Sequence, residues 1–226
     1  MIVFERPGPV NTDRLIELAV NSSVNCNYIV VASITGDSAL KVAKLVRDKK
    51  VVSVTCPQGM YWEVNKMDSG PFSDVPELRE IRDSWMEKGY QRVPMDTDKD
   101  KIKALCDYNV TIVKGTIPFF GPSFSMRLHI NHTNSLDIVA KTLEMISTGT
   151  LVCLETVLMA VDASAIPEGE EVLALAGTER GLDTAWIIRS CCSANLFHPE
   201  KGARLVELLA KPGISCQPDI MIEYLR

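Results

Sequence analysis

The sequence lacks the features that define several large classes of protein. None of its 226 residues belongs to an uncharged apolar stretch of about 18 residues, the length that a membrane-spanning helix needs. The first nine residues include Glu5 and Arg6 and lack the apolar core of a signal peptide. The net charge is −5 and Lys and Arg are scattered, so no basic stripe could neutralise nucleic-acid phosphates. We therefore expect a cytoplasmic protein with neither a membrane nor a nucleic acid as partner.

Known metal and catalytic motifs are also missing. The seven cysteines have no CxxC spacing, and the adjacent Cys191 and Cys192 fall in an expected strand, where neighbours point to opposite faces. His129 and His132 form an HxxH pair without an evident third ligand, so we expect no metal site. The chain has no GxSxG motif and no Walker loop ending in Gly-Lys-Ser/Thr. The sequence therefore identifies no catalytic residue.

What the chain does contain is the pattern of an α/β protein. Hydrophobic residues make up 46% and charged residues 23%, as in ordinary globular proteins. Apolar runs alternate with amphipathic segments, which predicts one domain over residues 1–226 with helices on both faces of a sheet. The stretch 57–73 is expected to be a loop that forms a lid or a partner surface. We expect strands over residues 2–5, 28–33, 51–55, 110–114, 171–176, 185–191 and 204–210, and helices over residues 12–25, 36–47, 74–88, 134–146 and 150–163.

The first candidate binding segment follows the expected strand 28–33. It supplies hydroxyls, a glycine and the start of a helix, where unpaired N–H groups and the helix dipole favour a phosphate. Ligands of open α/β sheets bind at such carboxyl ends of strands. The same residue types also cap helices when no ligand is present, so both interpretations stay open. The candidate residues of this segment are Ser33, Thr35, Gly36, Asp37 and Ser38.

A second glycine-containing segment follows the expected strand 171–176. Its glycines permit close backbone approach, its threonines supply hydroxyls, and Asp183 could accept a hydrogen bond from a ligand hydroxyl. An ordinary tight loop between two strands is the alternative interpretation. The candidate residues are Gly177, Thr178, Arg180, Gly181, Asp183 and Thr184.

Glu155 is the only charged residue between Leu151 and Val161, in a helix that is otherwise apolar. A carboxylate cannot be buried unpaired without a cost of several kcal/mol, so Glu155 either faces the ligand site or is a structural carboxylate with partners elsewhere. Thr55, Gly59 and Gly115 lie at or after the ends of two further expected strands and complete the candidate set.

Two long segments resemble a known family. The segment YIVVASITGDSALKVAKLVRDKKVVSVT resembles the strand, loop, helix and strand that open the C-terminal domain of pyruvate kinase, where this loop receives the phosphate of a sugar effector. The segment SLDIVAKTLEMISTGTLVCLETVLMAVDASAIPEGEEVLALAGTERGLDTAWII is similar to stand-alone, largely archaeal relatives of that domain that are associated with flavin mononucleotide (FMN). The resemblance implies a three-layer α/β/α fold with a mixed, mostly parallel sheet in which one strand runs against the others.

The resemblance also implies functions. The first is an FMN-binding protein, including a flavin-dependent oxidoreductase, and the second is a non-catalytic sensor of a phosphorylated metabolite that acts through a protein partner. Pyruvate kinase activity is not expected, because the catalytic barrel has no counterpart in 226 residues. The sequence leaves the oligomeric state open, a homo-oligomer included. Two residues depart from the family pattern: Asp37 places a negative charge in the phosphate loop, and Glu179 stands where a smaller residue is expected.

Overall fold

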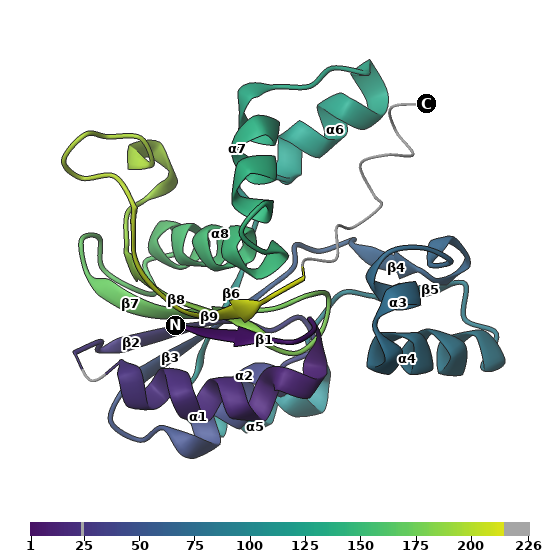
Figure 1. Ribbon diagram of the computed structural model, residues 1–226, viewed down its shortest axis with the longest axis horizontal. Helices are drawn as coiled ribbons and strands as arrows, with labels where there is room; N and C mark the ends of the chain where they lie inside the picture. The colour runs from purple at the N-terminus through teal and green to yellow at the C-terminus, as the bar shows by residue number, and fades with distance from the viewer. Residues whose placement is uncertain (24, 215–226) are drawn as a thin grey trace.

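A seven-stranded sheet forms the middle layer of the fold in the computed structural model, which describes residues 1–23 and 25–214 (Figure 1). The strand order is β1-β9-β8-β7-β2-β3-β6. Only β8 runs antiparallel to its neighbours, so the expected mixed, mostly parallel sheet is confirmed. The strands are β1 (Ile2–Phe4), β2 (Tyr28–Ala32), β3 (Lys50–Thr55), β6 (Thr111–Lys114), β7 (Glu171–Ala176), β8 (Thr184–Arg189) and β9 (Arg204–Pro212).

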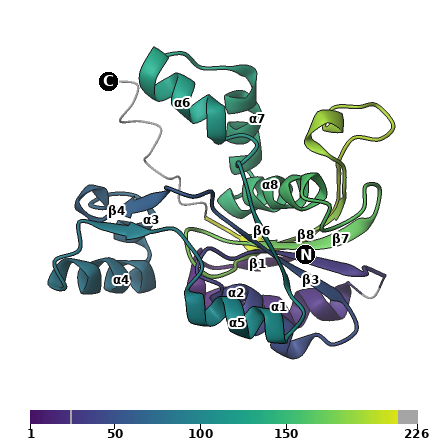
Figure 2. The same cartoon turned by 180° about the vertical axis from the view of Figure 1, so that it is seen from behind.

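Helices cover both faces of this sheet, as Figures 1 and 2 show from opposite sides. One face carries α1 (Thr12–Ser22), α2 (Asp37–Leu45) and α5 (Lys99–Asp107), and the other carries α8 (Thr148–Asp162), on which α7 (Ser135–Glu144) packs. The central strand β2 is apolar along its length because both its faces are buried. Val30 joins the core under α8, whereas Ile29 and Val31 join the core under α1 and α2.

A small cap is inserted between β3 and β6. It consists of β4 (Tyr61–Glu63), β5 (Arg92–Pro94), α3 (Pro71–Asp74) and α4 (Pro76–Glu87), and it lies at one end of the sheet (Figure 1). Its core contains Trp62, whose ring centroid lies 6.3 Å from that of Phe72 and 5.4 Å from that of Trp85. The expected loop over residues 57–73 was therefore wrong in part, because these aromatic rings give the segment a core of its own.

Other local expectations also need correction. The helices α5 and α6 (Gly121–Ile130) were not predicted from the sequence. The strand expected over residues 185–191 ends at Arg189, so Cys191 and Cys192 lie beyond β8. Gly149 was expected to break the preceding helix, but it lies in the first turn of α8. Ser147 caps α8 by accepting a hydrogen bond from the Thr150 amide. Within the described residues, no helix is long and apolar enough to cross a membrane.

We predict that Gly149→Ala destabilises the fold although alanine favours helices. A Cβ at Gly149 would lie 2.3 Å from Thr184 Oγ1, so α8 must shift away from β8. Overpacking of this kind costs about 1–3 kcal/mol, which urea unfolding would measure. Gly115→Ala is the control, because its methyl group would meet only Met159 Cε at 4.0 Å. Equal stability of the two variants would contradict the close packing of α8 on β8.

Candidate functional site

The candidate residues gather where four neighbouring strands end. Because β7, β2, β3 and β6 are parallel, their carboxyl ends meet at one edge of the sheet. The cap lies over this edge: Thr97, which follows β5, donates a hydrogen bond to the carbonyl of Ile34 at 3.1 Å, and Trp62 Nε1 donates to Glu179 Oε2 at 3.2 Å. The loops after β2 and β7 are therefore enclosed between the sheet and the cap.

The loop after β2 is held by its own hydroxyls. Ser33 Oγ accepts a hydrogen bond from the amide of Ala39 at 3.1 Å, and Thr55 Oγ1 donates to the carbonyl of Ile34 at 3.0 Å. These contacts confirm the capping interpretation for Ser33. The amides of Asp37 and Ser38, at the start of α2, donate no hydrogen bond to any described residue, and neither does the Ser38 hydroxyl. The loop therefore retains unused donors where the helix dipole is positive.

Asp37 points away from these amides and towards cations. Its carboxylate contacts Lys101 of α5 at 2.6 Å and Arg180 of the loop after β7 at 3.5 Å, and it accepts a hydrogen bond from Thr35 at 2.8 Å. Burial raises the pKa of Asp37, but its hydrogen bonds to Lys101 and Thr35 outweigh burial and leave the pKa below its usual value. The negative charge in the expected phosphate loop is thus neutralised by two cations that the loop itself does not contain.

The two candidate loops lie side by side. Arg180 Nη2 is 3.5 Å from Thr35 Oγ1 as well as from Asp37 Oδ2, and the guanidinium stacks over the Trp62 ring of the cap at 5.8 Å. The neighbouring Glu179 has a left-handed backbone with φ 58°, which is uncommon for a residue with a side chain. This conformation lets adjacent residues of one loop reach the cap and the loop after β2.

Asp183 has a different role from the one expected. It is fully buried, and its carboxylate accepts hydrogen bonds from the amides of Gly8 and Thr178 and from the hydroxyls of Thr178 and Thr184, all within 3.2 Å. Burial raises its pKa, and these donors oppose the rise. With its oxygens occupied by the protein, Asp183 does not face a ligand hydroxyl. It organises the loop instead.

Close packing within the fold explains most of the glycines in both loops, because it leaves no room for a Cβ atom. A Cβ at Gly177 would lie 2.6 Å from the carbonyl oxygen of Gly181, and one at Gly181 would lie 2.5 Å from Pro9 Cα. Gly36 has φ 91°, and a Cβ there would meet Thr97 Cγ2 at 2.9 Å. A β-branched residue at Gly36 would therefore clash with Thr97, which follows the cap. Loss of ligand binding in such a variant could come from this clash as well as from a lost ligand contact.

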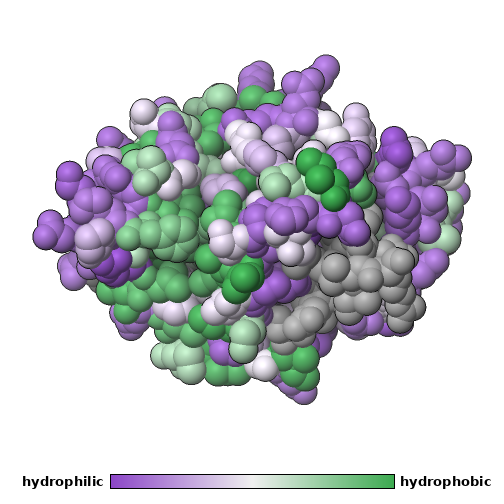
Figure 3. Space-filling view, turned by 90° about the horizontal axis from the view of Figure 1, so that it is seen from above, coloured by the Kyte–Doolittle hydropathy of each residue, from purple (hydrophilic) through white to green (hydrophobic). Residues whose placement is uncertain are grey.

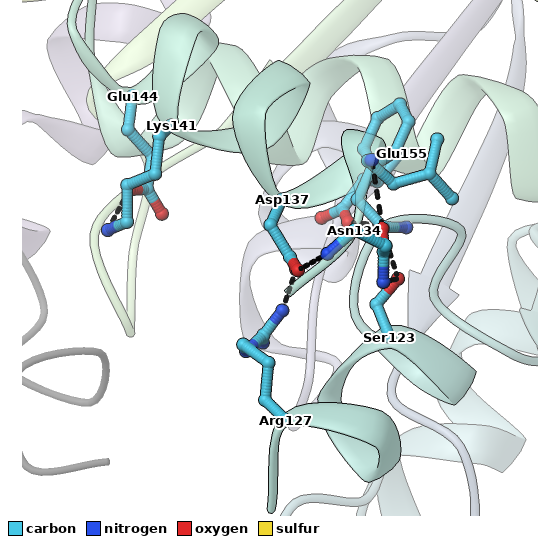
Figure 4. Close-up of polar contacts among 9 residues, drawn as sticks. Ser123, Arg127, Asn134, Asp137, Lys141, Glu144 and Glu155 are labelled. Carbon is cyan, nitrogen blue, oxygen red and sulfur yellow. Dashed lines mark hydrogen bonds and ion pairs between the residues drawn. The ribbon is translucent and has the colours of Figure 1, made fainter. Parts of the chain in front are cut away.

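Glu155 projects from α8 towards the loop after β6. It is 6% exposed, and Oε1 accepts a hydrogen bond from the Phe119 amide at 3.2 Å; Figure 4 draws this contact with the nearby pairs Ser123–Asn134 and Arg127–Asp137. The pKa of Glu155 is raised to about 8. Burial raises it most, the Phe119 amide opposes the rise, and the charge of Glu144 adds to it. Glu155 thus meets a loop amide, which is compatible with both interpretations of its role.

The remaining candidates contribute less. Gly115, at the end of β6, leaves open space where a side chain would be, apart from Met159. Gly59 lies in an exposed turn before β4, and no described contact joins it to the two loops. In the loop after β6, Phe119 is buried in the core under α8, and the Phe120 ring stacks on that of Phe124 with centroids 4.3 Å apart.

The structure adds residues that the sequence did not single out. Lys101 comes from α5, which was not predicted, and Trp62 comes from the core of the cap. The acidic N-cap residue Asp98 before an apolar-periodic stretch was a usable signal for α5. Cys56, directly after β3, lies within electrostatic reach of both Glu155 and Glu179, and burial and these carboxylates raise its pKa to about 12. Its thiol is therefore a neutral group at this edge.

Two hollows of the surface lie away from the candidate loops. One of about 410 Å³ is apolar and is formed by α7, α8 and the segment 196–205, on the side of the molecule seen in Figure 3, where apolar residues gather on the left. Another of about 220 Å³ lies by Arg47 and Tyr108 at the opposite end of β3. Among the described residues, no three His, Cys, Asp or Glu side chains form a cluster that could hold a metal ion.

We predict that Asp183→Asn lowers the free energy of unfolding by about 2–4 kcal/mol, because the new amide would point hydrogens at existing donors. Asp13→Asn provides the control: Asp13 is an exposed carboxylate that pairs with Lys41, and surface pairs contribute about 0–1 kcal/mol. Urea unfolding of both variants measures the difference. A loss no larger than that of the control would show that Asp183 does not hold the loop.

We also predict that Glu155 makes stability depend on pH. A carboxyl whose pKa is about 8 in the folded state and 4.5 when unfolded contributes most below pH 4.5 and loses that contribution as pH rises through 8. The stability of the wild type relative to Glu155→Gln should therefore fall by on the order of a few kcal/mol between these limits and then level off. Parallel curves for the two proteins would contradict the raised pKa.

No family model matches this chain. The resemblance to the pyruvate kinase C-terminal domain thus remains a prediction from the sequence, and the functional proposal depends on the geometry of the carboxyl edge.

Proposed function

We propose that the protein binds a phosphate-bearing small molecule, FMN, at the carboxyl edge of its sheet. The observation on which the proposal depends is the meeting of Lys101 and Arg180 at the start of α2, from two different parts of the chain. The resemblance of the loop residues 33–38 to a phosphate-binding loop supports the same position. FMN, when bound, would supply the redox chemistry.

The residues present fit a phosphate group. The amides of Asp37 and Ser38 and the hydroxyl of Ser38 donate to no described residue, and the two cations lie beside them. Asp37 now accepts the hydrogen bonds and ion pairs that a phosphate would accept. Because Asp37 is half exposed, its side chain has room to rotate outwards and leave both cations to the ligand.

The same contacts support a second function, a sensor of a phosphorylated metabolite. Arg180 touches Asp37 and Thr35 of the phosphate loop and also stacks on Trp62 of the cap. A phosphate that engages Arg180 would change its contact with the cap, which is also tied to the N-terminal segment by the Arg6–Glu77 ion pair at 2.5 Å. The cap would then report binding to a protein partner, with no reaction required.

We predict that wild-type protein binds FMN more tightly than riboflavin, which lacks the phosphate. Lys101→Met should weaken FMN binding by about tenfold or more, the usual value of a charge-assisted hydrogen bond, and leave riboflavin binding unchanged. Fluorescence titration of both flavins measures this, and the visible spectrum of the purified protein shows whether flavin copurifies. Lys41→Met, a cation of the same α2 surface that pairs with Asp13, is the matched control.

Equal affinity of the wild type for FMN and riboflavin would overturn the phosphate assignment. Binding of neither flavin, together with Lys101-dependent binding of a sugar phosphate such as fructose 1,6-bisphosphate, would replace FMN by a phosphorylated metabolite and favour the sensor.

A further inference from the structure

The buried carboxyl groups of Asp183 and Glu155 differ in how many hydrogen bonds they accept. Asp183 accepts four hydrogen bonds, two from amides and two from hydroxyls. Glu155 accepts a single one, from the Phe119 amide, and no described Lys, Arg or His pairs with it. Structural carboxylates in protein interiors are satisfied on both oxygens, as Asp183 is. Glu155 lacks the surroundings of a structural carboxylate.

The second oxygen of Glu155 is not sealed inside the protein. Among the described residues, the only fully enclosed side-chain oxygen or nitrogen without a hydrogen-bond partner is Ser53 Oγ. Glu155 Oε2 has no hydrogen-bond partner among the described residues, so it is not fully enclosed. Gly115, on the neighbouring loop, presents no side chain that would fill this space. A carboxyl group that is 6% exposed therefore retains one oxygen that no described residue occupies.

The charged and titratable groups around Glu155 include no cation that pairs with it among the described residues. Glu144 of α7, which pairs with Lys141 at 2.5 Å, adds a negative potential at Glu155. Cys56 at the end of β3 is a thiol whose pKa is raised to about 12, and the neighbouring Asp137 is engaged by Arg127. The loop before α6 contributes only the neutral Phe119 amide. Protonated Glu155 has an O–H on its free oxygen, and no described residue accepts a hydrogen bond from it.

We propose that Glu155 is a neutral acid of the binding site, which donates its O–H to a carbonyl oxygen or an unprotonated ring nitrogen of the ligand. The inference rests on the proposed function and adds the ligand's second recognition point, within electrostatic reach of Cys56. A neutral Glu155 would favour ligands that present a hydrogen-bond acceptor at this point over ligands that present a cation or only a hydrogen-bond donor. Full transfer moves the proton from the carboxyl oxygen to the ligand atom and leaves a carboxylate held by the Phe119 amide.

The test is the pH dependence of FMN binding, followed by fluorescence titration between pH 7 and pH 10. Wild-type affinity should fall by about fivefold or more as pH rises through 8, because ionised Glu155 has no proton to donate. Glu155→Gln keeps an N–H donor without a titrating group, so its affinity should match the wild type at pH 7 and stay constant. Glu155→Leu should bind about fivefold or more weakly at every pH, since it removes the donor.

A matched variant separates Glu155 from other titrating groups. Glu144→Gln removes a charge that raises the pKa of Glu155, so the midpoint of the wild-type profile should shift to lower pH. Lys101-dependent FMN binding with the same pH profile in wild type and Glu155→Gln would overturn the inference and leave the proposed function standing. Wild-type protein that binds no FMN at any pH would overturn both.

Discussion

The carboxylate of Asp183 is the interaction on which the candidate site depends. It joins the amide of Gly8, near the start of the chain, to the loop that follows β7 and to the first residue of β8. A buried carboxylate tolerates this position only because four donors replace its water shell. Because Asp183 fixes this loop, Glu179 can contact the cap and Arg180 can contact the loop after β2.

The parallel strands determine where the other groups meet. Every parallel strand delivers the residue after it to the same edge, so Ser33, Cys56 and Gly115 come together although about eighty residues separate the first from the last. The cap, inserted between β3 and β6, closes over this edge. The large apolar hollow beneath α7 lies away from these groups, so volume alone does not identify the site.

Charge divides this edge into two regions. Near the start of α2, Lys101 and Arg180 compensate Asp37, and free amides favour an anion. Around Cys56, Glu155 and Glu179 have raised pKa values because burial removes water and few donors replace it. The proposed ligand, with an anionic end and a neutral, acceptor-bearing end, would place one end in each region.

The layers of the fold followed from sequence patterns, because a short apolar run such as Tyr28–Ala32 is typical of a strand buried on both faces, and a helix that is apolar nearly all round, as α8 is, must be buried. The sequence also located the loops 33–38 and 177–184, since glycines and hydroxyls after such strands form a local pattern. Tertiary structure alone decided that Asp183 is structural and Glu155 sparsely bonded, and that Lys101 and Trp62 join the loops. Which donors surround a carboxyl group depends on contacts between residues far apart in the chain, and no local pattern encodes them.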